Sequence, residues 1–191
     1  MEACRITATD LACRRGERLL FAHLSLDLAA GQSLQVAGPN GLGKSSLIRL
    51  LAGLLRPFAG TVQHAGAMAL ADERPALDEH QPLGTALAFW GALDGGTAPL
   101  DRLGIAGLAD VPVRYLSTGQ RKRAALARLL GQKAPIWLLD EPLNGLDTHG
   151  VALVEALVAE HCVGGGIAIV ASHQAFAVPG LKRLDLADYA A

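Results

Sequence analysis

"SLQVAGPNGLGKSSLIRLL", residues 33–51, joins an apolar run to an amphipathic one through a glycine-rich loop. The apolar "SLQVAG" indicates a buried strand, and "KSSLIRLLAGLLRP" predicts a helix that ends at Pro57. Between them, "GPNGLGKS" at residues 38–45 fits the pattern G-x-x-x-x-G-K-[ST] in full. This loop, in its strand-and-helix context, predicts a cradle for phosphate groups in an α/β fold.

The residue types in this loop suit the chemistry of a nucleoside triphosphate. The glycines allow unusual dihedral angles and let the backbone approach phosphate oxygens closely. Lys44 is expected to reach the β- and γ-phosphates, and Ser45 to ligate Mg²⁺. The alternative without a binding role is a glycine-rich turn before an ordinary helix. The predicted nucleotide-binding residues are Gly38, Pro39, Asn40, Gly41, Leu42, Gly43, Lys44, Ser45 and Ser46.

A second apolar run ends in two carboxylates. "IWLLDEP" places four apolar residues before Asp140 and Glu141, as expected of a central parallel strand. Ligands of open α/β sheets bind at the carboxyl ends of the strands. Asp140 is therefore predicted to hold Mg²⁺, largely through water, and Glu141 to polarise the attacking water. The alternative is a strand followed by a solvated acidic turn.

His173 ends a third apolar run, "IAIVASH". Its position at a strand end predicts a γ-phosphate sensor or a partner that positions the attacking water. The alternative is a histidine that happens to lie on a loop. Glu141, His173 and Lys44 are thus the predicted catalytic residues.

The rest of the chain alternates between strand and helix patterns. Alternating leucines in "LFAHLSLDLAAG" predict a half-buried antiparallel strand near the N-terminus, and residues 60–70 predict another strand. Helices are expected over 118–131 and near 148–160, and a polar tail is expected after the last strand. Strand–helix–strand order predicts a parallel sheet that is covered on both faces.

The composition changes between these patterns. Residues 72–116 are predicted to form a small, partly helical insert in a single domain, 1–191, whose core comprises 1–71 and 117–191. The expected fold class is therefore α/β, a P-loop NTPase parallel-sheet core with an N-terminal antiparallel β subdomain and a small helical insert.

Composition and charge exclude several classes. With 51 % hydrophobic and 18 % charged residues, the 191-residue chain is neither disordered nor a coiled coil. A net charge of −1 gives no field that attracts nucleic acid, so no nucleic-acid partner is expected. No apolar run approaches the length that spans a bilayer, so we expect no direct membrane insertion. Three scattered cysteines fit a reducing cytoplasm better than a disulfide framework.

The helix that begins within "YLSTGQRKRAALARLL", residues 115–130, has an unusual first turn. Ser117 and Gln120 stand at capping-box spacing, so a purely structural role as helix caps is the alternative for both. Gly119 costs about 1 kcal/mol of helix propensity, and basic residues follow where the helix dipole is already positive. An anion is therefore expected at this helix start.

The order of phosphate loop, insert, "LSTGQ", acidic strand and histidine resembles the ATP-binding-cassette (ABC) ATPases. "LSTGQ" is similar to the family's signature motif LSGGQ, with Thr118 in place of the first glycine. The resemblance implies that two chains sandwich ATP with Mg²⁺, and that Ser117, Thr118, Gly119 and Gln120 contact the γ-phosphate held by the second copy. "NGLD" resembles the family's D-loop, which implies that Asp147 lies at the dimer seam; the alternative is a helix-preceding turn.

Two positions depart from the family pattern. The aromatic residue that usually stacks on adenine is replaced by arginine, and Arg14 and Arg15 are both candidates for that role. Arg74 stands where the family has a glutamine that links Mg²⁺ to the membrane partner, and the nearby Gln81 is out of register.

Further stretches resemble the branch of the family that serves cytochrome c maturation: "DVPVRYLSTGQRKRAALARLL", "APIWLLDEPLNGLDTHGV", "CRRGERLLF" and "ASHQ". This resemblance implies a peripheral location on the cytoplasmic face of the bacterial inner membrane. It also implies transmembrane partners resembling CcmB and CcmC, and ATP hydrolysis coupled to haem export or to release of the haem-loaded chaperone CcmE.

Three classes of function remain open from the sequence. The first is an ATPase subunit of this or another small ABC transporter, for which "TALAFWGAL" offers Phe89 and Trp90 to a membrane partner unless they pack within the insert. The second is a soluble ABC ATPase outside transport. The third is a nucleotide-binding module that does not turn over, suggested by the missing glutamine.

Overall fold

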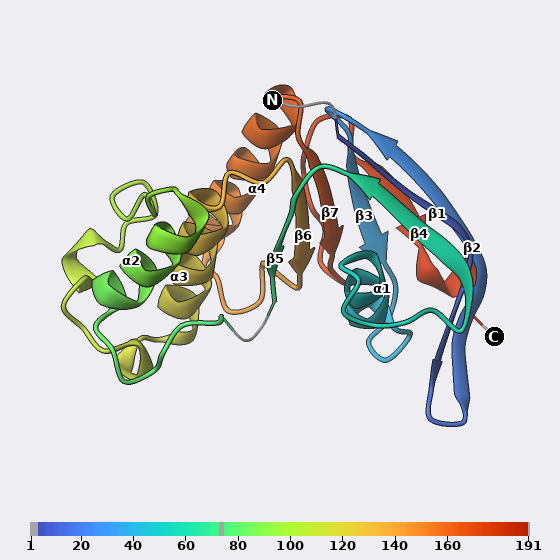
Figure 1. Ribbon diagram of the computed structural model, residues 1–191, viewed down its shortest axis with the longest axis horizontal. Coiled ribbons are helices and arrows are strands. Elements are labelled where there is room, and N and C mark those ends of the chain that lie inside the picture. Colours follow the sequence, from blue (N-terminus) through green and yellow to red (C-terminus); the bar gives the residue numbers. More distant parts are fainter. Residues whose placement is uncertain (1–3, 73–74, 191) are drawn as a thin grey trace.

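The computed structural model describes residues 4–72 and 75–190 and contains two sheets (Figure 1). The larger sheet has five parallel strands in the order β5-β6-β7-β3-β8. Its strands are β3 (Ser33–Ala37), β5 (Met68–Ala71), β6 (Ile136–Asp140), β7 (Ile167–Ala171) and β8 (Lys182–Asp185). Every residue of β3, β6 and β7 is buried, as the continuous apolar runs predict.

The smaller sheet is antiparallel and is formed by strands from the N-terminal part of the chain. It has the order β2-β1-β4 and comprises β1 (Arg5–Arg15), β2 (Arg18–Ala29) and β4 (Ala59–Ala65). In β2, Leu24 and Leu28 are buried while Ser25 and Asp27 are exposed. The predicted half-buried antiparallel strand is confirmed.

Helices cover both faces of the parallel sheet (Figure 1). Helix α1 (Lys44–Leu51) lies between the two sheets, whereas α3 (Thr118–Gly131) and α4 (Thr148–Val163) cover the opposite face. Because alternate side chains of a strand point to opposite faces, Leu138 packs in the core around α1 and Leu139 in the core around α3 and α4. The α/β fold with two kinds of sheet is confirmed.

Residues 75–116 lie beside α3 and contain α2 (Leu83–Asp94) with two short 3-10 helices, Ala106–Leu108 and Val113–Tyr115. Leu83, Leu103 and Ile105 are fully buried in the same hydrophobic cluster as α3 and α4. The insert is therefore partly helical, as predicted, and shares a core with the rest of the chain.

Helix α1 is shorter than predicted. It ends at Leu51 because Gly53 adopts φ 72°, and the Leu54 amide donates back to the Arg49 carbonyl at 2.9 Å. This is a glycine-based helix stop, which precedes the predicted stop at Pro57.

Two further predictions need correction. The strand expected over residues 60–70 is two strands, β4 and β5, because Gly66 at φ 100° turns the chain from one sheet into the other. The expected polar tail contains β8, which pairs with β3, followed by the 3-10 helix Leu186–Tyr189. A polar edge strand of four residues carries too little hydrophobic pattern to be recognised.

Among the described residues, no helix combines the length and the hydrophobicity needed to cross a membrane.

Candidate functional site

The predicted phosphate loop joins β3 to α1 and wraps around the N-terminus of that helix. Gly43 precedes the helix at φ 106°, and a Cβ there would stand 3.1 Å from a Leu20 methyl. Gly41, at φ 86°, faces open space. No described side chain caps α1. Its first N–H groups therefore point at the space where an anion would bind.

Lys44 curls back over the loop and is only 5 % exposed. Its ammonium donates to the carbonyls of Gly38 at 2.9 Å and Pro39 at 3.3 Å and to Asn40 Oδ1 at 3.2 Å. It also lies 3.4 Å from Glu141 Oε1. A buried cation is thus held at the mouth of the loop by oxygens that a triphosphate can replace.

Ser45 and Asp140 come together although they lie far apart in the sequence. The Ser45 hydroxyl donates to Asp140 Oδ1 at 2.9 Å, and Asp140 is 4 % exposed. Burial raises the pKa of the Asp140 carboxyl, and the hydrogen bond from Ser45 acts against that rise. A hydroxyl beside a desolvated carboxylate is an oxygen donor set of the kind that Mg²⁺ prefers.

Glu141 is held from several elements at once. Its Oε2 lies 3.0 Å from His173 Nδ1 and its Oε1 faces Lys44. Its amide donates to the carbonyl of Ala171 in β7 at 2.8 Å. The residue adopts φ 47°, the left-handed region that non-glycine residues rarely occupy. The carboxylate is 10 % exposed, so it faces the site from a nearly dry position.

His173 follows β7 on a loop that Gln35 positions. The buried Gln35 side chain, in the middle of β3, donates to the Gln174 carbonyl at 2.7 Å and to the Ser172 carbonyl at 3.4 Å. Sequence reasoning overlooked Gln35. The available signal was a polar side chain inside an apolar strand, since a buried amide needs partners.

Lys44, Ser45 and Glu141 line a cavity of about 380 Å³ at the carboxyl edge of the parallel sheet, whereas Asp140 and His173 contact its lining residues Ser45 and Glu141. It is lined by Leu20, Asn40, Gly41, Gly43, Lys44, Ser45, Ser46, Glu141 and Asn144. Two of these, Leu20 and Asn144, were not among the predicted binding or catalytic residues. Leu20 comes from β2 and reaches the loop only because the antiparallel sheet folds over α1.

The signature-like residues line a different cavity, of about 510 Å³. Ser117 and Gln120 form the predicted capping box, each side chain accepting from the backbone of the other. A Cβ at Gly119 would stand 3.1 Å from the Gly145 carbonyl, which is a packing reason for this glycine. Thr118 also lines this cavity and would press against any side chain at Gly145.

Asp147 lines the second cavity and caps α4. Its Oδ1 accepts from the Gly150 amide at 2.7 Å and lies 3.5 Å from an Arg123 guanidinium nitrogen. The helix-preceding turn, which was the alternative for this residue, is therefore present. Its side chain is still 70 % exposed, which leaves it accessible to another molecule.

One short segment borders both cavities. Glu141 and Asn144 line the first, while Gly145, Leu146 and Asp147 line the second. The chain thus brings the phosphate loop, Ser45, Asp140, Glu141 and His173 together, and keeps the signature-like stretch apart. The predicted site residues of one protomer are therefore divided between two separate cavities.

Other candidates lie away from these cavities. The Arg14 guanidinium stacks over the exposed Phe58 ring, 4.6 Å from its centroid. Of the two candidates for stacking on adenine, Arg15 is therefore the one without an aromatic contact in the described structure. Gln81 lines a groove of the insert. Arg74 lies outside the described residues.

That groove, of about 400 Å³, runs beside α2. Phe89 on its edge is 61 % exposed. Trp90 is half-buried: its indole N–H donates to the Ala76 carbonyl at 2.6 Å and its ring lies 3.7 Å from the Arg128 guanidinium carbon. Phe89 therefore presents an apolar surface, whereas Trp90 fastens the start of the insert to α2.

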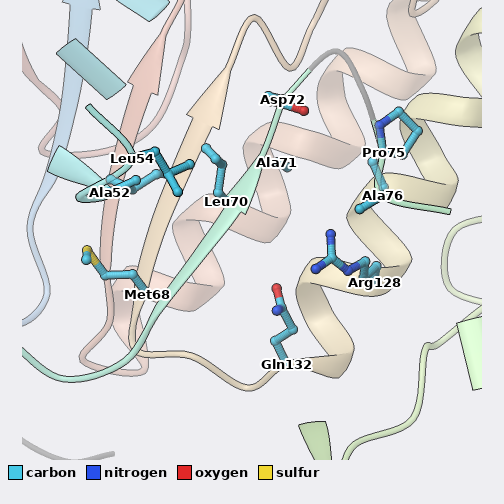
Figure 2. Close-up of a pocket in the computed structure, with 12 residues that line it drawn as sticks. Ala52, Leu54, Met68, Leu70, Ala71, Asp72, Pro75, Ala76, Arg128 and Gln132 are labelled. Atoms are coloured by element: carbon cyan, nitrogen blue, oxygen red, sulfur yellow. The ribbon is translucent and has the colours of Figure 1, made fainter. Parts of the chain in front are cut away.

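A further cavity of about 330 Å³ separates β5 from α3, and Figure 2 shows Arg128 and Gln132 pointing into it. Its other lining residues are mostly apolar, with Asp72 at the end of β5. None of the predicted nucleotide-binding, catalytic or metal residues lines it.

The chain is similar to known proteins in both sequence and fold. The family model described as "ABC transporter" matches residues 21–89 and 95–144. A protein of Novosphingobium aromaticivorans, "Cytochrome c biogenesis ATP-binding export protein CcmA", is 56 % identical over 189 residues, covering 99 % of both chains. A protein of the same name from Zymomonas mobilis is 49 % identical over 191 residues and covers 98 % of this chain and 86 % of that one.

Among solved structures, an ABC transporter ATP-binding protein from Pyrococcus furiosus has a TM-score of 0.84 at 20 % identity. The match covers 98 % of this chain and 100 % of that one, so the two share a fold from end to end.

Proposed function

Because the chain belongs to the ABC transporter family, and within it to the group of cytochrome c biogenesis ATP-binding export proteins, we propose that it is the ATP-hydrolysing subunit of a membrane complex for cytochrome c biogenesis. The observation that carries this proposal is the convergence of Lys44, Glu141 and His173 at the carboxyl edge of the parallel sheet. Such a set of residues is needed for phosphoryl transfer to water and is superfluous for nucleotide binding alone.

ATP is the proposed substrate of the first cavity. The loop 38–46 and the N-terminus of α1 would hold its phosphates, with Lys44 exchanging its loop carbonyls for phosphate oxygens. Ser45 and Asp140 would hold Mg²⁺, which when bound neutralises charge that develops on the phosphate oxygens. Arg15 is the proposed contact to the adenine base.

Glu141 is the proposed base for the attacking water. Its carboxylate accepts the proton as the water oxygen bonds to the γ-phosphorus and the bond to the β-phosphate oxygen breaks, which releases ADP and phosphate. His173 keeps the carboxylate aimed by its contact to Oε2. Lys44 balances the charge that accumulates on the transferred group.

A second copy of the chain would complete the site. Ser117, Thr118, Gly119, Gln120 and Asp147 lie in the second cavity, and we propose that they meet the γ-phosphate held by the partner. Hydrogen bonds to a charged phosphate are worth about 1.5–3 kcal/mol each. Loss of the γ-phosphate would remove them and open the dimer, which is the motion passed to the membrane subunits.

The complex is proposed to lie on the cytoplasmic face of the bacterial inner membrane, with transmembrane subunits resembling CcmB and CcmC. Hydrolysis would drive haem export or the release of the haem-loaded chaperone CcmE. The groove beside Phe89 supports a peripheral attachment, since it exposes an apolar ring that a partner could cover. The proposed division of the domain keeps residues 1–71 and 117–191 as the core and 72–116 as the insert.

The test uses Glu141→Gln, which removes the proton acceptor and keeps the shape of the side chain. We expect steady-state ATPase activity to fall by about 10²-fold or more, while ATP affinity is retained. Tagged Glu141→Gln protein, solubilised from membranes with Mg-ATP, should recover small polytopic partners by mass spectrometry, CcmB and CcmC among them.

Equal and negligible rates for wild type and Glu141→Gln would contradict the ATPase. Recovery of ribosomes or DNA would instead favour a soluble ABC ATPase outside transport. Recovery of other membrane proteins would move the chain to a different small transporter.

A further inference from the structure

The main chain of Glu141 has a partner that the proposed mechanism does not use. Lys122, in the second turn of α3, donates from its ammonium to the Glu141 carbonyl at 2.9 Å. Lys122 is half-buried, as are its basic neighbours Arg121 and Arg123. The contact therefore joins the helix of the second cavity to the residue at the centre of the first.

Glu141 needs such support because of its backbone. Its φ of 47° is strained for a residue with a side chain, and strained residues persist only where their surroundings over-determine them. The amide of Glu141 is held by Ala171, whereas on the carbonyl side the Asn144 amide lies at 3.4 Å, a weak contact. The charged donor of Lys122 is the short bond on that side.

The direction of the carboxylate follows from this backbone. From φ 47° the side chain reaches Lys44 with one oxygen and His173 with the other. A return to an extended φ would swing the side chain about the main chain and break both contacts. The carbonyl contact and the carboxylate contacts therefore depend on the same dihedral angle.

We propose that Lys122 is a positioning residue for hydrolysis, which couples the signature-like helix α3 to the carboxylate of Glu141 in the same chain. Helix α3 begins at the capping box of Ser117 and Gln120, so a γ-phosphate bound there by the partner copy bears on the helix that carries Lys122. Arrival of the partner's nucleotide thereby sets the geometry of the protomer's own general base. The inference rests on the proposed ATPase function and adds the link between the two half-sites.

Lys122→Met removes the donor and keeps the aliphatic stem. We expect kcat to fall at least about tenfold with KM changed less than about threefold, because the general base is misplaced while the phosphate loop is untouched. Lys122→Arg should restore most of the rate, since a guanidinium also donates to a carbonyl. In a Glu141→Gln background, Lys122→Met should cause no further loss.

A second readout is independent of turnover. In nucleotide-free protein, hydrogen exchange of residues 141–147 should quicken in Lys122→Met and stay near wild type in Lys122→Arg. Lys182→Met is the matched control, because Lys182 is an exposed lysine whose ammonium bonds Gln32 on the far side of the molecule. It should change neither exchange nor rate.

The outcomes separate the two proposals. An active wild type with unchanged kcat and unchanged exchange in Lys122→Met overturns the positioning role. A wild-type protein without ATPase activity would overturn the proposed ATPase function and the coupling that rests on it. The hydrogen-exchange result would still show whether the contact between Lys122 and the Glu141 carbonyl orders residues 141–147. Should Lys122→Met fail to fold, Lys122→Leu, which also lacks a donor, takes its place, and its wild-type rate and exchange would equally overturn the inference.

Discussion

At the residue scale, the site concentrates charge where water is scarce. Lys44, Asp140 and Glu141 are all buried at the edge of the sheet, and each is paired with a polar partner. Buried charges are costly unless they are paired, so such a cluster marks a place that is organised for a charged ligand rather than for stability.

Asp140 gives a prediction about pH. Burial raises its pKa, so between the ordinary value of 3.8 and the raised value the folded state binds the proton more tightly than the unfolded state. Stability is therefore lost as the pH rises through that window, and ionised Asp140 destabilises the nucleotide-free protein at pH 7. Asp140→Asn should raise the Tm at pH 7, by about 2–4 °C for each kcal/mol recovered.

The gain should vanish below the ordinary pKa, where wild-type Asp140 is protonated in both states. Calorimetry at several pH values measures it, and the added stabilisation by Mg-ATP should shrink in the variant. Ser45→Ala, which removes the hydrogen bond that favours the ionised carboxylate, should shift the Tm downward. A lower Tm for Asp140→Asn at pH 7 without nucleotide would contradict the argument.

At the scale of elements, α3 serves two purposes. Its capping box satisfies its own N-terminus, while its buried face, with Ala124, Leu126 and Leu129, packs into the core. The same first turn lines the second cavity. A change at Ser117 therefore acts on helix stability and on the proposed contact with the partner's nucleotide.

Ser117→Arg separates the two effects when it is compared with Ser117→Ala. Both lose the cap, at a cost of about 1 kcal/mol. Only arginine fills the second cavity, so it should abolish the ATP-dependent dimer of the Glu141→Gln protein in light scattering. ATP binding by the monomer should be nearly unchanged in both, and lost monomer affinity in Ser117→Arg would argue against a contact in trans.

At the scale of the whole molecule, the proposed nucleotide and partner surfaces lie on different parts of the fold. The phosphate loop lies at the sheet, whereas the exposed Phe89 lies on α2, at the far side of α3 in Figure 1. Trp90 and Arg128 tie α2 to α3 and to the segment that follows β5. A partner docked at the groove can therefore respond to movement of α3.

Phe89→Asp should release the protein from its membrane partners, because a carboxylate cannot be buried at an apolar contact without cost. Recovery of the protein with washed membranes measures the effect, and ATP binding by the soluble fraction should be retained. Val163→Asp is the control, since Val163 is 91 % exposed at the end of α4 and away from the groove. Wild-type attachment of Phe89→Asp would count against this docking surface.

The sequence by itself determined the local elements whose pattern is complete within a few residues. Consecutive residues specify the phosphate loop, the apolar strands β3, β6 and β7, and helix α3 with its capping box. The catalytic and trans-binding roles stay predictions.

Only the tertiary structure decided what distant segments do to one another. Three hydrogen bonds join residues on different elements. Ser45 donates to Asp140, Gln35 donates to the loop that carries His173, and Lys122 donates to the Glu141 carbonyl. The division of the predicted site residues between two cavities likewise depends on the tertiary structure. Such contacts depend on the order of strands in the sheet and on how helices pack against it, and neither is encoded in the periodicity of a single segment.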